Sequence, residues 1–216
     1  MKNPVRARRE EEKEKRRKSI LDAAERVIAR HGWEATNFGE IAKLTRLSRS
    51  LVYVYFPTRD DLFHAIVDRG MAMLEQRFQA AIAKQGTGIE QVMALGRAYY
   101  EFSKREPFYF DLLSHFQARQ LDPKSQSMSE ESANTHGRSC LRALAQAIGT
   151  GIADGTIRKS IGPPGLAAFA IWAFTHGLIQ ISERKEPLLK QDFKVSAPQM
   201  VEHSMALLRG ALVATD

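Results

Sequence analysis

The segment Asn37–Leu62, NFGEIAKLTRLSRSLVYVYFPTRDDL, carries the most informative pattern in this chain of 216 residues. Asn37 is followed three residues later by Glu40, a spacing that resembles a capping box and predicts a helix over 38–45. Ser48 is a favourable N-cap for a second helix over 48–55, and Pro57 ends that pattern. Helices this short are not stable alone, so both must pack against a neighbouring element.

The residues before this segment predict that support. Apolar side chains recur at spacings of three and four from Ile20 to Ile28, which predicts a helix with one apolar stripe that ends at His31-Gly32. Ala42 is small enough for a close helix crossing, and Val52 is apolar where a three-helix core needs it. An alanine, a turn four residues later and an apolar residue ten later form the pattern of a helix-turn-helix.

In a helix-turn-helix, the second short helix enters the DNA major groove and presents its outward residues to base edges. The expected base-facing residues are Arg49, Ser50, Tyr53 and Val54. An arginine here can donate a fork of hydrogen bonds to guanine, and a valine or a tyrosine ring can contact a thymine methyl group.

Phosphate contacts are expected from Tyr55 and from Arg59, which begins the next helix. Two structural alternatives remain open at this point. The Tyr55 ring can pack between helices without reaching DNA, and Arg49 can be a solvated residue at a helix start.

The remainder of the chain has helical periodicity nearly everywhere. A long helix is expected from about 59 to 84, with Asp60 and Asp61 in a first turn that favours negative charge. The later helical stretches are 89–104, 107–119, 127–153, 164–184 and 197–213. We therefore predict an all-α protein of about nine helices, with a helix-turn-helix DNA-binding domain and its basic N-terminal arm over 1–65 and a larger domain over 66–216.

Charge and cysteine content restrict the class of protein further. The formal net charge is +7, and residues 1–65 hold fifteen basic and ten acidic side chains, so most of the surplus lies there. Such a surplus indicates an anionic partner, although a basic N-terminal run can also be a frayed, solvated helix start. The single cysteine, Cys140, predicts a reduced, cytoplasmic setting. The longest apolar run, Leu166–Phe174, is too short to cross a bilayer, and the basic N-terminus does not resemble a secretory signal.

The sequence resembles the TetR family of bacterial transcriptional regulators over roughly residues 18–65. The resemblance rests on Glu40-Ile41-Ala42, on Leu47-Ser48 and on the run Leu51–Asp60, LVYVYFPTRD. Thr36 lies inside this match and is counted among the expected DNA-binding residues. Two positions depart from the family pattern: Arg46 replaces the usual turn glycine, at a φ angle expected to be positive, and Ser50 replaces a small glycine.

The resemblance implies a second domain that binds a small-molecule effector and forms a homodimer through its last two helices. An aromatic-rich stretch over 99–116 and the helix over 164–184 are the expected sources of the effector pocket. The pocket residues expected are Tyr99, Phe102, Phe110, Phe116, Trp172 and His176, although aromatics at helical spacing are more often ordinary core. The expected dimer residues are Phe169, Trp172, Met205 and Leu208.

Other functional classes have weaker support. His136 and Cys140 have the spacing of two metal ligands on a helix, but no third ligand is close in sequence, so we predict neither a metal nor a cofactor. Phosphate-binding loops and common hydrolase motifs are missing, so we predict that the protein is not an enzyme. The sequence predicts a homodimeric regulator, most simply a repressor, that leaves a palindromic operator when an effector binds. The alternative is a helical protein-interaction module with a vestigial pocket.

Overall fold

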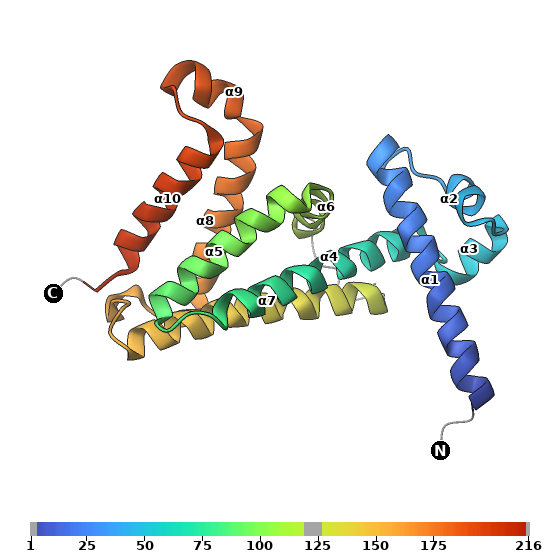
Figure 1. Cartoon of the computed structure of the whole chain (residues 1–216), viewed down its shortest axis with the longest axis horizontal. Coiled ribbons are helices and arrows are strands. Elements are labelled where there is room, and N and C mark those ends of the chain that lie inside the picture. The colour runs from blue at the N-terminus through green and yellow to red at the C-terminus, as the bar shows by residue number, and fades with distance from the viewer. Residues whose placement is uncertain (1–3, 119–126, 215–216) are drawn as a thin grey trace. The chain divides into compact units, whose positions relative to one another are not determined.

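The computed structural model describes residues 4–118 and 127–214, and over these residues the protein is all-α, as predicted (Figure 1). The α-helices are α1 (Pro4–His31), α2 (Phe38–Thr45), α3 (Arg49–Tyr55), α4 (Arg59–Ile82), α5 (Gly88–Arg105), α6 (Pro107–Gln117), α7 (Met128–Ala153), α8 (Pro164–Arg184), α9 (Glu186–Leu188) and α10 (Ala197–Leu212). The nine predicted helices correspond to α1–α8 and α10. Residue 119, at the end of the sixth predicted stretch, lies outside the described residues.

The chain divides into two compact units. The N-terminal unit contains residues 1–69 and 112–133, and the C-terminal unit contains residues 70–111 and 134–216. Helices α4, α6 and α7 each contribute residues to both units. The functional division at residue 65 remains a prediction, since compactness alone does not assign DNA binding or effector binding to either unit.

The core of the N-terminal unit forms where the apolar stripe of α1 meets α2 and α3. Ile20, Ile41 and Val52, one from each helix, are completely buried. Both predicted caps are present. The Asn37 side chain accepts a hydrogen bond from the Glu40 backbone N–H at 3.0 Å, and the Ser48 hydroxyl accepts one from the Leu51 N–H at 3.1 Å. These caps stabilise two helices of only eight and seven residues.

The turn between α2 and α3 has the left-handed geometry that the sequence predicts at Arg46. Arg46 has φ +56° and ψ +33°. Its N–H donates to the Lys43 carbonyl, and the Leu47 N–H donates to the Ala42 carbonyl at 3.0 Å. This pair of hydrogen bonds is the Schellman arrangement, which satisfies the last carbonyls of α2 and turns the chain into α3.

The C-terminal unit is built around contacts among α5, α8 and α10. The start of α5 lies very close to the end of α7. A Cβ atom added to Gly88 would lie 1.9 Å from the backbone nitrogen of Gly151, so only glycine fits at residue 88. The Gly88 N–H donates to the Asp154 carboxylate at 2.7 Å, and the Ile89 N–H donates to the Thr156 hydroxyl at 3.2 Å. Hydrogen bonds from Gly88 and Thr156 lower the pKa of Asp154, with the Thr156 side chain making the largest contribution.

A short additional segment joins α8 to α10. One turn, α9, leads into a π-helical turn over Leu189–Phe193, and Lys194 closes it with φ +57°. Elements this short leave no periodic signal, which is why the sequence does not predict them. An isolated antiparallel bridge pairs Ile157 with Val213, and the Arg158 N–H donates to the Leu212 carbonyl at 3.0 Å.

Helix α8 is long and apolar enough to cross a membrane when judged by length and composition alone. About 39% of its most apolar window is buried, where α8 packs within the C-terminal unit. The expectation of a chain without a membrane span therefore stays a prediction.

Candidate nucleic-acid interface

The outer face of α3 carries the four residues that the sequence assigns to base contacts. Arg49, Ser50, Tyr53 and Val54 are all exposed, and Val54 is 73% exposed. Val52, between them in sequence, is completely buried. The helical repeat therefore gives this single short helix one side for the core and one side for a ligand.

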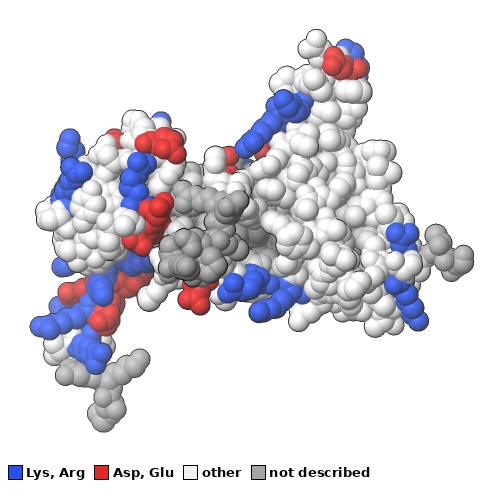
Figure 2. All heavy atoms as spheres, turned by 180° about the vertical axis from the view of Figure 1, so that it is seen from behind, with Lys and Arg blue, Asp and Glu red and all other residues white. Residues whose placement is uncertain are grey.

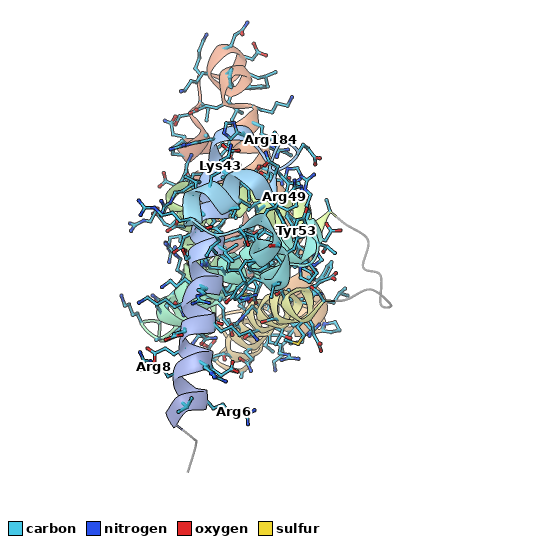
Figure 3. All side chains as sticks on the ribbon, turned by 90° about the vertical axis from the view of Figure 1, so that its right-hand side faces the viewer. Arg6, Arg8, Lys43, Arg49, Tyr53 and Arg184 are labelled. Carbon is cyan, nitrogen blue, oxygen red and sulfur yellow. The ribbon has the colours of Figure 1, made fainter. Side chains whose placement is uncertain are left out.

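Arg49 and Tyr53 form a pair on this face (Figure 3). An Arg49 guanidinium nitrogen donates to the Tyr53 hydroxyl at 3.4 Å, and the guanidinium lies 5.7 Å from the ring centroid. The other side of the pair is fixed by Phe38 of α2, whose ring centroid is 4.7 Å from that of Tyr53. Arg49 has further N–H donors in its planar fork, so the pair holds its direction while those donors stay available to an acceptor.

The remaining predicted DNA-binding residues lie around this face in different environments. The Ser50 hydroxyl is 3.0 Å from that of Ser48, at the start of α3. Tyr55 is half-buried, at the end of the same helix. Thr36 is only 3% exposed, and its hydroxyl donates to the Gly32 carbonyl at 2.9 Å, so the structure gives it a local role in the turn after α1.

Arg59 holds the connection between α1 and α2. Its guanidinium donates to the Trp33 carbonyl at 2.7 Å and to the Glu34 carbonyl at 3.3 Å, and it lies 5.2 Å from the Trp33 ring centroid. The side chain is nevertheless exposed. Sequence reasoning missed this structural role, because the partners are backbone carbonyls more than twenty residues away. It also missed Lys43, an exposed basic residue on α2 (Figure 3).

The C-terminal unit contains an aromatic cluster that includes several of the expected pocket residues. The Tyr99 hydroxyl is 2.8 Å from Nδ1 of His176, and the ring centroids of Phe110 and Trp172 lie 5.5 Å and 6.1 Å from that of His176. Burial, with a smaller contribution from the charge of Arg184, lowers the pKa of His176. These groups form a mainly apolar cluster with one polar pair inside it.

The other two expected pocket residues, Phe102 and Phe116, have different contacts. Phe102 is completely buried, and the guanidinium of Arg77 lies 5.7 Å from its ring centroid. Phe116 belongs to the N-terminal unit, where its ring centroid lies 5.9 Å from that of His64. Sequence spacing placed both with the cluster because they continue its run of aromatics.

The expected dimer residues also differ in exposure. Phe169 is 53% exposed, and Trp172 and Leu208 are half-buried. Met205 is buried inside the C-terminal unit, facing Gly96 of α5. Further apolar residues are exposed on the same two helices: Leu166, Phe174, Ile181 and Leu207.

His136 and Cys140, which have the spacing of two metal ligands on one helix, have different surroundings in the structure. His136 Nδ1 and the Ser139 hydroxyl both contact the Glu75 carboxylate of α4. These contacts lower the pKa of Glu75, with the Ser139 hydrogen bond as the largest cause. Cys140 is buried, which raises its pKa to about 12. Within the described ranges, no three histidine, cysteine or acidic residues form a group that could hold a metal ion.

Three consecutive features define the class of this protein: a short capped helix, a left-handed turn, and a second short helix with one exposed face. Together they define a helix-turn-helix protein. A sequence profile of bacterial regulatory proteins of the tetR family matches residues 20–66, which include the C-terminal part of α1 and all of α2 and α3.

Curated relatives agree with this match. The HTH-type transcriptional regulator YhgD of Bacillus subtilis is 25% identical over 178 residues, which is 82% of this chain and 89% of YhgD. The regulator YfiR of the same organism is 36% identical over 61 residues, 28% of this chain. That second match spans only 30% of YfiR.

Solved structures share the fold. A tetR-family regulatory protein from Rhodococcus RHA1 superposes with a TM-score of 0.68 at 19% identity, over 94% of this chain and 99% of the other. FadR from Bacillus subtilis in complex with stearoyl-CoA gives 0.66 at 19% identity, over 89% and 97% of the two chains. AibR in complex with isovaleryl coenzyme A and operator DNA gives 0.65 at 19% identity, with the same coverage. The chain belongs to the TetR family and is a DNA-binding transcriptional regulator.

Proposed function

We propose that this regulator is a homodimeric repressor that binds a palindromic operator and leaves it when a small molecule binds the C-terminal unit. The exposed face of α3 carries the proposal, because Arg49, Ser50, Tyr53 and Val54 are presented together on a helix fixed by the Arg46 turn. Arg49 and the methyl groups of Val54 supply the donors and apolar contacts that read guanine and thymine in the major groove.

A palindromic operator follows from the small reach of one α3 helix. A helix of seven residues contacts only a few base pairs. Two copies about 34–36 Å apart reach successive major grooves on one side of the duplex and read an inverted repeat. Tyr55, Arg59 and backbone N–H groups at helix starts are the proposed phosphate contacts that set the register.

The proposed dimer surface is the exposed apolar part of α8 and α10. Leu166 and Phe169 at one end of α8, Phe174 and Ile181 further along, and Leu207 of α10 are between 44% and 69% exposed. Large apolar side chains gathered on two adjacent helices favour association, because a second copy removes them from water. Trp172 and Leu208 lie at the half-buried edge of this surface.

The aromatic cluster of the C-terminal unit is the proposed effector site. An effector would take the place of packed rings near Tyr99 and His176, and the ring nitrogen and hydroxyl would then be free to bind its polar groups. The long helix α4 contributes to both units and is the proposed lever between them. Release requires only that the effector prefers the conformation in which two α3 helices no longer match successive grooves.

The proposed protein is cytoplasmic, and it binds its effector without catalysing a reaction of it. Stearoyl-CoA, isovaleryl-CoA and choline, the ligands of three structural neighbours, are suitable first members of an effector panel. A screen of this panel, followed by operator titration, would identify the class of effector that releases this protein from DNA.

The first experiment is selection of DNA from a random pool, followed by titration of the selected duplexes at two salt concentrations. We expect enrichment of an inverted repeat that binds one dimer. Weak binding without sequence preference, lost steeply as salt rises, would contradict the proposal and reduce the N-terminal unit to general phosphate attraction. A protein-interaction module would then be the better reading of the chain.

The second experiment tests Arg49 directly. Arg49→Ala is expected to reduce discrimination at one operator base pair by about 1–3 kcal/mol, the usual contribution of a bidentate base contact. Arg26→Ala, an exposed arginine on α1, is the charge-matched control. If Arg49→Ala weakens binding to every sequence equally, Arg49 contacts phosphate and not a base.

A further inference from the structure

Four basic side chains form one row along the first half of α1. Arg6, Arg9, Lys13 and Arg16 follow one another at spacings of three, four and three residues, so they share one face of the helix, and all four are exposed. We call them the basic row. The same face continues through Ile20, Ala24 and Val27, whose side chains are buried against the rest of the N-terminal unit. The basic row therefore points to the side of α1 on which the helix-turn-helix packs.

The basic row differs from the opposite side of α1 in its charge balance. No carboxylate lies within ion-pair distance of its four members, counted over the residues that the structure describes. On the other side, Arg8 pairs with Glu12 at 3.5 Å. Figure 2 shows side chains of both signs along this end of α1. Figure 3 shows Arg6 projecting toward the side of Arg49 and Tyr53, and Arg8 projecting away from it.

The next residue, Arg17, attaches this helical extension to α3. Its guanidinium lies 5.2 Å from the ring centroid of Phe56, the residue that caps α3, and it donates to the Ser129 hydroxyl at 3.3 Å. The helix is continuous from Pro4 to His31. The extension is therefore an ordered rod with a fixed direction relative to the recognition helix, and not a loose tail.

The charge and shape of the row favour duplex DNA as its partner. An amphipathic helix that lies on a membrane needs an apolar face, and Val5 is the one large apolar residue that α1 exposes between residues 5 and 19. A duplex instead presents a regular line of phosphates. From residue 6 to residue 16 the row is roughly 15 Å long at 1.5 Å per residue, enough to follow several consecutive phosphates.

We propose that the basic row is a second DNA contact, which binds the phosphate backbone of the operator flank while α3 binds the half-site. This inference rests on the proposed function, because it requires an operator bound by α3. It adds that affinity depends on duplex length beyond the bases that α3 reads.

The test compares two double variants with the same loss of charge. Arg9→Gln/Lys13→Gln removes two members of the basic row, and Arg8→Gln/Lys15→Gln removes one arginine and one lysine from other sides of the same exposed helix. Each is titrated at 50 and 200 mM salt on the selected operator, with short flanks and with flanks about ten base pairs longer. Two lost phosphate contacts lower the salt slope by about 1.8, so the variant should lose about tenfold less affinity than wild type between these salt concentrations. Arg9→Gln/Lys13→Gln should also bind the operator with long flanks no more tightly than the operator with short flanks.

The outcomes separate this inference from the proposed function. If wild type selects an operator and both variants behave as wild type does, the basic row does not bind DNA, and the proposed function is untouched. If both variants lose the same affinity, only net charge matters and the inference is wrong. If wild type selects no operator, both proposals fail. Wild-type binding to phosphatidylserine vesicles that Arg9→Gln/Lys13→Gln abolishes, with unchanged DNA binding, would assign the row to a membrane surface.

Discussion

Arg46 shows how one residue sets the geometry of the DNA-reading motif. Its left-handed backbone lets α2 end and α3 begin with satisfied carbonyls, yet a side chain in this region is sterically unfavourable by about 1–2 kcal/mol. The sequence departs from its family at this position and keeps the turn all the same. The hydrogen bonds of the turn and the packing of the inner faces of α2 and α3 outweigh the local cost.

Arg46→Gly should therefore stabilise the protein. We expect the free energy of unfolding to rise by about 0.5–1 kcal/mol, because relief of the left-handed strain exceeds the additional chain entropy of glycine. Urea unfolding followed by circular dichroism measures the change. Arg46→Ala keeps the Cβ atom and should leave stability nearly unchanged. An equal gain from alanine would show that the arginine side chain, and not the backbone, is unfavourable.

His176 makes stability depend on pH in a predictable direction. Burial and the nearby Arg184 lower the pKa of His176 in the folded protein below its ordinary value of 6.5. As the pH falls through 6.5, the unfolded chain takes up a proton that the folded chain resists, so the free energy of unfolding decreases. His176→Gln removes this contribution. The difference in Tm between pH 7.5 and pH 5.5 should be smaller in the variant, and an identical difference in both proteins would contradict this cause.

The site residues illustrate what sequence alone predicts. The inner and outer sides of α3 follow from helical periodicity, so the exposure of Tyr53 and Val54 and the burial of Val52 could be predicted. The attachment of Arg59 to the Trp33 carbonyl could not be predicted, because it depends on a backbone position set by tertiary packing. The neighbours of Phe116 and Met205 could not be predicted for the same reason: periodicity gives the buried face of a helix, but not the element that covers it.

At the scale of elements, the extent of each helix depends on more than apolar spacing. The first half of α1 has no apolar stripe, so the sequence places a helix securely only from Ile20, whereas α1 begins at Pro4. Proline is well suited to a helix start because it needs no N–H partner there. Good helix formers such as glutamate, lysine and arginine continue the helix without a core.

Substitution of two glycines near the contact between α5 and α7 should have opposite effects on stability. Gly88→Ala should destabilise the protein by at least about 2 kcal/mol, because its Cβ atom would overlap the Gly151 backbone, which cannot move aside as a flexible side chain can. Gly149→Ala, inside α7, has open space around the new atom and should stabilise by up to about 1 kcal/mol. Thermal unfolding of the two variants checks both. A tolerated Gly88→Ala would mean that the helices are not in close contact.

At the scale of the whole molecule, regulation requires two copies that act together. Phe169→Glu places a charge in the proposed dimer surface, where Phe169 is 53% exposed in one copy. We expect monomers at micromolar concentration and a loss of affinity for the inverted repeat, with single half-sites affected much less. Sedimentation and operator titration measure the two effects. Gln146→Glu, an exposed position on α7, is the control for added charge, and a Phe169→Glu protein that remains dimeric would place the interface elsewhere.

The buried thiol of Cys140 can report on local opening of α7 through its reaction with thiol reagents. A buried thiol with a pKa of about 12 is almost entirely protonated at neutral pH, so maleimide reagents should spare it while α7 stays packed. A cysteine introduced at Val54 can then be labelled selectively in the otherwise natural chain, which gives a fluorophore on the DNA-facing helix. The slow modification of Cys140 itself would time the rare events in which α7 opens, with and without a bound effector.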